Sequence, residues 1–283
     1  MAIFNMVGGG GFNLVGMMWL ERSTFPSGAY SGSAVVFNNE IHILGGTGHY
    51  KWNGSSWTSV STLPYEFNKG SAVVFNNEIH LLGGTGGSYR NTKHYKWNGS
   101  SWTSVPTLPY EFSTGSAVVL NNEIHILGGN AYNSEHYKWN GSTWKSVSNL
   151  PYSFSQGSAV VLNGEIHILG SYNGSGCTSK HYKWNGSSWT SVSTLPYEFN
   201  NGSAVVLNNE IHILGGYNYN NSYANLGHYK WNGSNWERVS NLPHRYAYGS
   251  AVVLNNEIHI LGGGHSDYTN TDHYSYGEVY TKA

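Results

Sequence analysis

The chain has few charged residues, one cysteine and no long apolar run, and each shortage excludes a class of protein. Only 10% of its 283 residues are charged and the net charge is −1, so the chain lacks the basic surface that binds nucleic acid. Cys177 is the only cysteine, so no disulfide can form within the chain. No apolar run approaches the ~20 residues of a membrane-spanning helix, so we expect no membrane insertion.

The N-terminal residues also lack the features of a secretory signal. The segment MAIFNMVGGGGFNLVGMM has neither a basic start nor a continuous apolar stretch, and signal peptides need both. The location of the protein therefore stays open, and the expected alternatives are the cytoplasm and a virus particle.

Motifs of known enzymes are missing as well. The sequence has no Gly-x-Ser-x-Gly nucleophile turn, no Ser-x-Asp-x-Gly-x-x-Trp box of the sialidases, and no cysteine–tyrosine–histidine set for a copper-radical oxidase. We therefore expect a non-catalytic protein without a cofactor.

What the sequence does have is an internal repeat. The stretch Gly-Ser-Ala-Val-Val occurs six times, at intervals of 38 to 47 residues. A period of roughly 40–50 residues built from short strands is typical of a closed propeller. The six copies begin at Gly32, Gly70, Gly115, Gly157, Gly202 and Gly249.

Each repeat predicts four short antiparallel strands, which we name a, b, c and d. In the second repeat they are Gly70–Phe75, Glu78–Leu82, His94–Trp97 and Trp102–Val105. Asn-Asn at 76–77 suits a two-residue turn between a and b, and Asn-Gly at 98–99 suits a type I′ hairpin between c and d. The predicted fold is all-β: a six-bladed β-propeller of four-stranded antiparallel blades.

The repeat resembles the kelch family. Two glycines follow strand b, and farther on a tyrosine and a tryptophan stand with six residues between them. The fourth repeat keeps Tyr182 and Trp189 but has Gly170-Ser171 in place of the glycine pair. The resemblance covers about residues 17–283 and implies a propeller, while kelch propellers include enzymes, lectins and interaction platforms. The residues that carry it are Gly45-Gly46, Tyr50 and Trp57; Gly83-Gly84, Tyr95 and Trp102; Gly128-Gly129, Tyr137 and Trp144; and Gly215-Gly216, Tyr229 and Trp236.

The last repeat ends without a strand d, and the missing strand is found at the other end of the chain. Trp19–Pro26 aligns with Trp57–Pro64 of the first repeat, so the N-terminal strand is expected to complete the last blade. This closure joins the chain ends and leaves no open sheet edge. It divides the chain into a glycine-rich tail, residues 1–16, and the propeller, residues 17–283.

The tail carries a second resemblance. Residues 1–11 resemble the leader MxIFNMVxGGG of tail-associated proteins from phages and prophages of low-GC Gram-positive bacteria. The resemblance implies a virion protein that attaches to a larger assembly through this tail. The alternative is a flexible tail without such a role.

The order of strands places different loops on the two faces of the ring. The a–b and c–d turns are uniform and share one face, here named the uniform face. The b–c loops differ in every blade and share the opposite face, the variable face, with the d–a loops. The b–c loops are rich in Tyr, Ser, Asn and Gly, as binding loops are, so a cell-surface glycan or protein is the expected partner.

The d–a loops repeat Leu-Pro-Tyr-Glu-Phe or close variants of it. The Phe is expected in the core. The Tyr and Glu are expected to face solvent beside the channel, with packing between blades as the alternative for Tyr. The candidate ligand-binding residues of the variable face are Tyr65, Glu66, Tyr89, Arg90, Tyr110, Glu111, Tyr132, Tyr152, Tyr172, Tyr197, Glu198, Tyr217, Tyr219, Tyr223, His244, Arg245 and Tyr268.

Twelve histidines recur at two repeat positions, one in strand b and one at the start of strand c, as His80 and His94 do. Such repetition spreads them around the ring, whereas a metal site needs ligands that converge, so packing and hydrogen bonding between blades are expected. Asp267, Asn270 and Asp272 share the last b–c loop and carry oxygen ligands suited to Ca²⁺. That loop lacks the Gly and the terminal Glu of an EF-hand, and no metal is expected.

These observations favour a binding module, with two alternatives. One is a sugar-modifying enzyme such as a mutarotase or epimerase, whose acid–base residues would come from Glu66, Glu111, Glu198, His244 and Asp267. The other is a repeat-amplified or designed scaffold without a ligand, whose loops would be as uniform as its strands.

Overall fold

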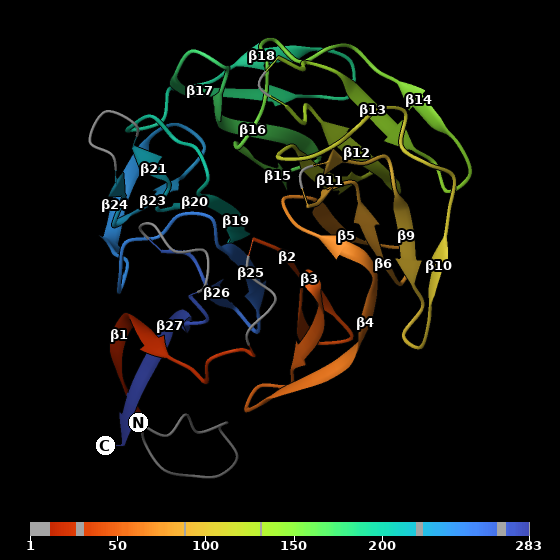
Figure 1. Ribbon diagram of the computed structural model, residues 1–283. Coiled ribbons are helices and arrows are strands. Elements are labelled where there is room, and N and C mark those ends of the chain that lie inside the picture. Colours follow the sequence, from red (N-terminus) through yellow and green to blue (C-terminus); the bar gives the residue numbers. More distant parts are fainter. Residues whose placement is uncertain are drawn as a thin grey trace.

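The computed structural model describes residues 12–26, 31–87, 89–130, 132–218, 223–264 and 270–282. These residues form strands, turns and loops, and none of them lies in a helix that could span a membrane. Six sheets stand around a central axis, and strand a of each blade is the innermost strand (Figure 1). The six-bladed β-propeller predicted from the repeat is confirmed.

Five blades contain four separate antiparallel strands, and in the first blade strands b and c run on as the single element β3. The strands are β2 (Ser33–Phe37), β3 (Glu40–Trp52) and β4 (Trp57–Phe67) in blade 1; β5 (Ser71–Phe75), β6 (Glu78–Leu82), β9 (His94–Trp97) and β10 (Trp102–Ser104) in blade 2; β11 (Ser116–Leu120), β12 (Glu123–Leu127), β13 (His136–Trp139) and β14 (Trp144–Ser146) in blade 3; β15 (Ser158–Leu162), β16 (Glu165–Tyr172), β17 (Cys177–Trp184) and β18 (Trp189–Ser191) in blade 4; β19 (Ser203–Leu207), β20 (Glu210–Leu214), β23 (Gly227–Trp231) and β24 (Trp236–Asn241) in blade 5; and β25 (Ser250–Leu254), β26 (Glu257–Leu261), β27 (His273–Lys282) and β1 (Phe12–Glu21) in blade 6.

The two kinds of turn on the uniform face have different geometries. Asn76 and Asn77 form a two-residue a–b turn with φ of 49° and 58°, as expected for the left-handed pair of a type I′ turn. The type I′ prediction for the c–d turn is wrong, because the register pairs Trp97 with Trp102 and leaves four residues in the loop. Asn98 Oδ1 accepts hydrogen bonds from two N–H groups of this loop, at 2.9 Å each, so its side chain shapes the turn.

The inner strands are joined to one another by the serine of the repeated motif. The Ala72 N–H donates to Ser33 Oγ of the preceding blade at 3.1 Å. Equivalent bonds run from Ala159 to Ser116, from Ala204 to Ser158 and from Ala34 to Ser250, while Ser71 and Ser203 donate to the carbonyls of Gly115 and Gly249. The six inner strands thus form a closed ring held by hydrogen bonds between blades.

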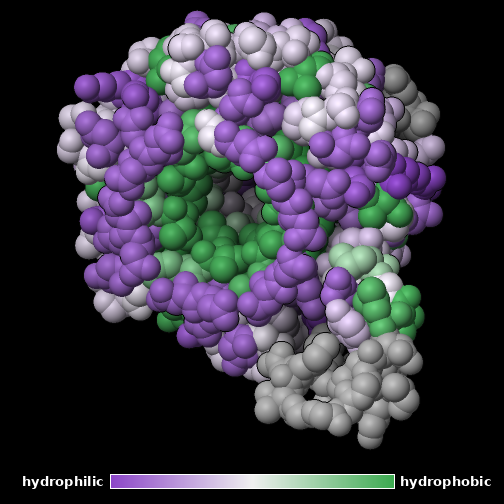
Figure 2. Space-filling view, turned by 180° about the vertical axis from the view of Figure 1, so that it is seen from behind, coloured by the Kyte–Doolittle hydropathy of each residue, from purple (hydrophilic) through white to green (hydrophobic). Residues whose placement is uncertain are grey.

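The valines of the same motif line the central channel. Two valines of each blade, such as Val73 and Val74, face a cavity of about 400 Å³. Figure 2 shows this hydrophobic wall inside a hydrophilic rim.

The hydrophobic core lies between the blades rather than within them. At the junction of blades 2 and 3, Phe112 is fully buried and packs in one cluster with Leu82, Ile124 and Trp139. The prediction that the d–a phenylalanines belong to the core is confirmed. Phe67, Phe154 and Phe199 are also fully buried, as is Tyr246 at the fifth position.

The first glycine after strand b is required by this packing. Gly128 has φ of +63°, and a Cβ there would lie 1.9 Å from the carbonyl oxygen of Phe154. A Cβ added at Gly83, Gly170 or Gly215 would likewise clash with a backbone carbonyl oxygen of the next blade junction. The fourth repeat keeps this glycine, and its Ser171 replaces only the second one, where the Oγ accepts a hydrogen bond from the Ser155 N–H at 3.0 Å.

The N-terminal strand closes the ring as predicted. β1 pairs antiparallel with β27, and Trp19 stands opposite Tyr276, as Trp102 stands opposite Trp97 in blade 2. β1 begins at Phe12, so residues 12–16, assigned to the tail from the sequence, also pair with the C-terminal strand. Residues 1–11 lie outside the described part of the chain.

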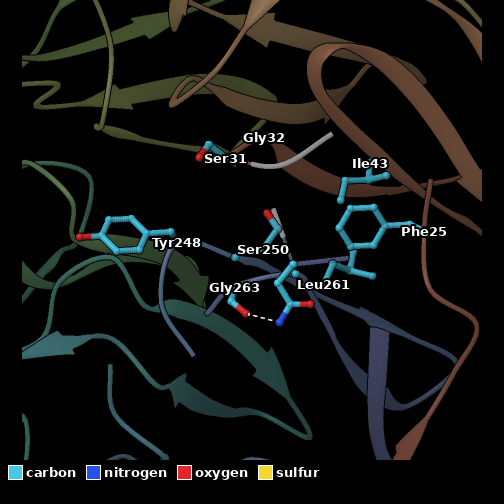
Figure 3. Close-up of a pocket in the computed structure, with 11 residues that line it drawn as sticks. Phe25, Ser31, Gly32, Ile43, Tyr248, Ser250, Leu261 and Gly263 are labelled. Atoms are coloured by element: carbon cyan, nitrogen blue, oxygen red, sulfur yellow. Dashed lines mark hydrogen bonds between the residues drawn. The ribbon is translucent and has the colours of Figure 1, made fainter. Parts of the chain in front are cut away.

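A substitution in the last blade is offset by a residue of the N-terminal segment. In the other blades a strand-c lysine pairs with the first glutamate of strand b, as Lys96 does with Glu78 at 2.9 Å. The last blade has Ser275 instead of this lysine, and Arg22 supplies the cation, 2.8 Å from Glu257. Phe25 of the same N-terminal segment packs with Ile43 and Leu261 at the junction of blades 6 and 1 (Figure 3).

We predict that Gly128→Ala lowers the free energy of unfolding by about 3 kcal/mol, because the added Cβ meets backbone and the left-handed conformation disfavours alanine. Gly176→Ala is the matched control, since a Cβ at Gly176 meets nothing within 4 Å. Urea unfolding of both variants measures the difference, and equal stability of the two would contradict this account of the glycine pair.

Candidate ligand-binding face

The d–a tyrosines face the neighbouring repeat instead of solvent. The Tyr65 hydroxyl donates to the carbonyl of Gly83 in the next repeat at 2.8 Å. Burial raises the pKa of Tyr65 above its usual range. The prediction that these tyrosines face solvent beside the channel is therefore wrong, and the alternative of packing between blades holds. The same bond joins Tyr110 to Gly128, Tyr152 to Gly170, and Tyr197 to Gly215.

The glutamates beside these tyrosines differ in exposure. Glu66 is exposed, and its two oxygens accept hydrogen bonds from the Asn68 amide at 3.0 Å and the Gly87 N–H at 3.1 Å. Glu111 is exposed and Glu198 is half-buried. The three carboxylates stand at three different blade junctions.

The b–c loops present tyrosines on their outer surface. Tyr89 and Tyr132 are each 82% exposed, and Tyr223 is 37% exposed, whereas Tyr172 and Tyr217 are half-buried. Three of these loops form small hairpins that the sequence did not predict: β7 (Thr85–Gly86) with β8 (Tyr89–Arg90), β21 (Tyr217–Asn218) with β22 (Tyr223–Ala224), and the tip where Tyr172 pairs with Cys177. Tyr219 and Tyr268 lie outside the described residues.

The two arginines of the variable face have different surroundings. Arg90 is exposed at the end of β8. The Arg245 guanidinium lies 4.3 Å from the centre of the Tyr223 ring and donates to the Ala224 carbonyl at 2.8 Å. His244 Nδ1 lies 2.8 Å from the Arg245 carbonyl oxygen, so this pair helps to shape its own loop.

One position at the channel entrance combines variability with an unusual backbone. The residue directly before each Gly-Ser-Ala-Val-Val differs in all six repeats, although the motif itself is unchanged. All six residues have positive φ, between 49° and 63°. We name this set the mouth ring; its members are Ser31, Lys69, Thr114, Gln156, Asn201 and Tyr248.

The mouth ring is tied together through its backbone. Five of the six N–H groups donate to the carbonyl of the preceding member, at distances of 2.6 to 2.8 Å. A second set of hydrogen bonds between blades thus runs around the channel entrance, beside the bonds of the motif serines, which we name the serine ring. The five bonds run from Lys69 to Ser31, from Thr114 to Lys69, from Gln156 to Thr114, from Asn201 to Gln156 and from Tyr248 to Asn201.

The side chains of the mouth ring surround a cavity of about 300 Å³ at the variable-face entrance of the channel. The Asn201 amide donates to Gln156 Oε1 at 3.2 Å, and Thr114 Oγ1 lies 2.9 Å from Ser155 Oγ. Lys69 is exposed. Figure 3 shows the Tyr248 phenol pointing away from the packed junction of blades 6 and 1.

The choice of side chains at this position is costly for the fold. A left-handed conformation costs a residue other than Gly, Asn or Asp roughly 1–2 kcal/mol, and for a β-branched residue such as Thr114 it is a clear outlier. The residues of the a–b turns also have positive φ, and only Asn and Gly occur there, as at Asn76-Asn77 and Asn163-Gly164. Strained residues of this kind gather at ligand sites, so the mouth ring has the character of a binding surface.

The mouth ring was not predicted, although the sequence carries one signal for it. A single position that varies completely beside an unchanged motif is visible in the printed repeats. Its meaning depends on φ and on its place at the channel entrance, and neither can be read from residue types.

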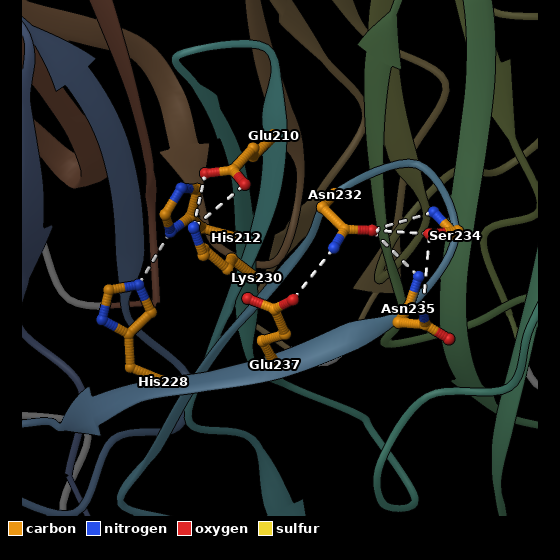
Figure 4. A network of polar contacts seen from close by, with 8 residues as sticks. All are labelled: Glu210, His212, His228, Lys230, Asn232, Ser234, Asn235 and Glu237. Carbon is orange, nitrogen blue, oxygen red and sulfur yellow. Dashed lines mark hydrogen bonds and ion pairs between the residues drawn. The ribbon is translucent and has the colours of Figure 1, made fainter.

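The twelve histidines are structural, as predicted. In each blade the strand-b histidine Nδ1 lies 2.8 or 2.9 Å from the strand-c histidine Nε2. Figure 4 shows one such pair, His212 and His228. The predicted packing between blades is confirmed, since His94 contacts Trp139 and Trp144 of the next blade. The predicted hydrogen bonding between blades is wrong, because each histidine pair lies within one blade.

The candidate calcium ligands do not form a site among the residues that the structure describes. The Asn270 amide donates to the Gly263 carbonyl at 2.8 Å, and its Oδ1 accepts from the Asp272 N–H at 2.7 Å, so its side chain closes its own loop. Asp267 lies outside the described residues. The described residues also contain no group of three His, Cys, Asp or Glu side chains that could hold a metal ion.

Comparison with known proteins supports the fold. No family model matches the chain, and no curated protein sequence matches it. Among solved structures, that of YjhT is similar, with a TM-score of 0.78 and 16% identity over 93% of this chain and 97% of that one. At this identity the likeness shows a shared propeller fold, and the kelch and phage-tail resemblances stay resemblances.

We predict that the protein unfolds steeply in mild acid. Burial lowers the pKa of His80 to about 4 and that of His94 to about 3, and the other pairs are alike. Below about pH 6.5 these histidines are protonated in the unfolded chain but stay neutral in the folded chain. Each histidine therefore lowers the free energy of unfolding by up to about 1.4 kcal/mol for each pH unit of acidification.

With twelve such groups, we expect the transition between about pH 6 and pH 5, measured by tryptophan fluorescence and far-ultraviolet circular dichroism. Carboxylates titrate mostly below this range. A chain that stays folded at about pH 4 would show that the buried histidines accept protons without loss of structure.

Proposed function

We propose that this protein is a non-catalytic binding module that recognises a cell-surface glycan or protein through its variable face. The mouth ring carries the proposal: six different side chains stand at one repeat position, in a backbone conformation that glycine would adopt without strain. A scaffold without a ligand has no reason to bear this strain.

The chemistry of the mouth ring favours a glycan over a protein. Ser31 and Thr114 offer hydroxyls, Gln156 and Asn201 offer amides, and these groups donate and accept hydrogen bonds as sugar hydroxyls require. Tyr248 adds an aromatic ring that can pack against a sugar face. The cavity of about 300 Å³ is at the lower end of the size range for small-molecule sites.

The exposed tyrosines of the b–c loops extend this surface outward. Tyr89 and Tyr132 are rigid, amphipathic and largely exposed, which suits a partner that covers several blades. We propose that a ligand enters the mouth ring with one end and contacts these loops with the rest.

We further propose that the protein is a receptor-binding component of a phage or prophage tail. The leader in residues 1–11 supports this assignment. The fold is compatible with it, because β1 leaves the ring at the uniform face, opposite the proposed binding face. An enzymatic role is less favoured, since Glu66, Glu111 and Glu198 stand at three separate junctions instead of in one pocket.

The test is a chain with Thr114→Gly, Gln156→Gly and Tyr248→Gly, probed on a glycan array and on whole cells of Gram-positive strains. Glycine keeps the left-handed backbone and the backbone bonds of the mouth ring, and the relief of strain offsets the two side-chain bonds of Gln156 and Thr114 that are lost. We therefore predict a melting temperature equal to or above that of the parent chain, together with at least a tenfold loss of binding, since about 1.4 kcal/mol of lost contacts suffices for that.

Tyr110→Phe is the control for the rest of the variable face. It removes one hydrogen bond between repeats and is expected to lower stability by about 1 kcal/mol without changing binding. Unchanged binding by the triple-glycine chain would remove the mouth ring from the site. No binding by the parent chain to any glycan or cell would overturn the proposed function.

A further inference from the structure

Large exposed hydrophobic side chains occur at two places in the part of the chain that the structure describes. Three are tyrosines of the b–c loops on the variable face. The other five lie on β1 and β27, and 36% to 56% of each is exposed. These five are Leu14, Val15, Met17, Met18 and Tyr280.

The five residues belong to a two-stranded ribbon that extends beyond the ring. Residues 12–18 of β1 pair with Gly277–Lys282 of β27, past the point where the other blades turn from strand c to strand d. Figure 1 shows this ribbon leaving the ring toward the labelled chain ends, and Figure 2 shows hydrophobic side chains where it emerges. We name it the terminal ribbon.

One face of the terminal ribbon continues a surface that is buried inside the ring. Trp19 and Tyr276 lie opposite each other and pack on His228 of blade 5. Strand alternation and the register place Leu14, Met17 and Tyr280 on the same face, farther out. The exposed fractions of these three side chains show that no blade covers them there. The exposed Glu278 lies on this face opposite Met17, and its carboxylate accepts a hydrogen bond from the Tyr280 hydroxyl.

The outer edge of the terminal ribbon is also open to pairing. β1 is the edge strand of its sheet and is ten residues long. In the other blades the outer strands are β4 with eleven residues, β24 with six, and β10, β14 and β18 with three each. A long apolar edge strand is a template for strand pairing, and a two-stranded ribbon is marginally stable alone in water. Both features predict that the ribbon is covered in the functional protein.

We propose that the terminal ribbon pairs with the terminal ribbon of a second copy of this chain. From Asn13 to Leu20 the edge carries no charged residue, and Glu278 lies on the inner strand β27 rather than on the edge strand β1. Two β1 edges can therefore pair without bringing like charges directly opposite each other, and the net charge of −1 gives little long-range repulsion. Antiparallel pairing of one strand with its own copy forms a symmetric interface that closes after two subunits. The binding faces of the two copies then point away from the interface.

This inference is independent of the proposed ligand, and the test needs no ligand. Analytical ultracentrifugation of the full chain over a range of concentrations should show a species of twice the chain mass. The variant Leu14→Lys with Met17→Lys puts charge on the shared face and should shift the dimer dissociation constant upward at least tenfold. Its melting temperature and circular dichroism, measured at a concentration where the parent is also a monomer, show whether it is folded.

Thr103→Lys with Thr190→Lys is the matched control. Both threonines are exposed on edge strands of other blades, and Lys145 already stands at the equivalent position in blade 3. This control adds the same charge elsewhere and should leave the dimer intact.

Two results would overturn the proposal. The first is a parent chain that stays monomeric up to the limit of its solubility, which would assign the ribbon to a different partner. The second is a dimer that persists unchanged when the folded Leu14→Lys, Met17→Lys variant is measured, which would place the interface elsewhere.

Discussion

The structure depends on hydrogen bonds that join each blade to the next around the channel. Blades of four short strands have little core of their own, and their apolar faces are buried only against neighbours, as Phe112 is between blades 2 and 3. The serine ring and the mouth ring hold the inner strands at the spacing that this packing needs. The tyrosine hydroxyls add a third set of links farther out, where Tyr65 reaches Gly83.

These links between blades explain why most positions are the same in every repeat, while the mouth ring and the b–c loops differ. The links between blades use serine Oγ, tyrosine hydroxyls and backbone groups, and the buried histidine pairs fill the space between strands b and c. The motif serine and the two histidines therefore recur in every blade, and the tyrosine recurs in four of the six d–a loops. The backbone bonds of the mouth ring do not depend on residue type, so its side chains can vary from blade to blade. Side-chain bonds add to the ring only locally, as between Asn201 and Gln156 and between Thr114 and Ser155. The b–c loops have the same freedom because they stand outside the blade junctions.

Sequence reasoning predicted the architecture because the repeat and its turns are local signals. Six copies of one motif gave the blade number, and the alignment of Trp19 with Trp57 gave the closure. The candidate site was harder to predict. The sequence Tyr-Glu in a loop does not show whether the tyrosine faces solvent or a neighbouring blade. For Tyr65 the answer depends on the position of the Gly83 carbonyl, which accepts its hydrogen bond. The left-handed backbone of Thr114 and Gln156 leaves no signal in residue type, since neither residue is typical of that conformation. The terminal ribbon was missed because residues 12–16 fall outside the repeat.

We propose that the side chains of the mouth ring serve binding, and that the stability they add through bonds such as that of Asn201 to Gln156 is smaller than the cost of their left-handed backbone. The most direct measurement is the thermal unfolding of a chain in which all six mouth-ring residues are replaced by glycine. We predict a melting temperature equal to or above that of the parent, because relief of left-handed strain offsets the roughly 0.5–1 kcal/mol that each glycine loses in chain entropy. A clear fall in melting temperature would show that these side chains hold the propeller together, and would contradict the assignment of the mouth ring to ligand binding.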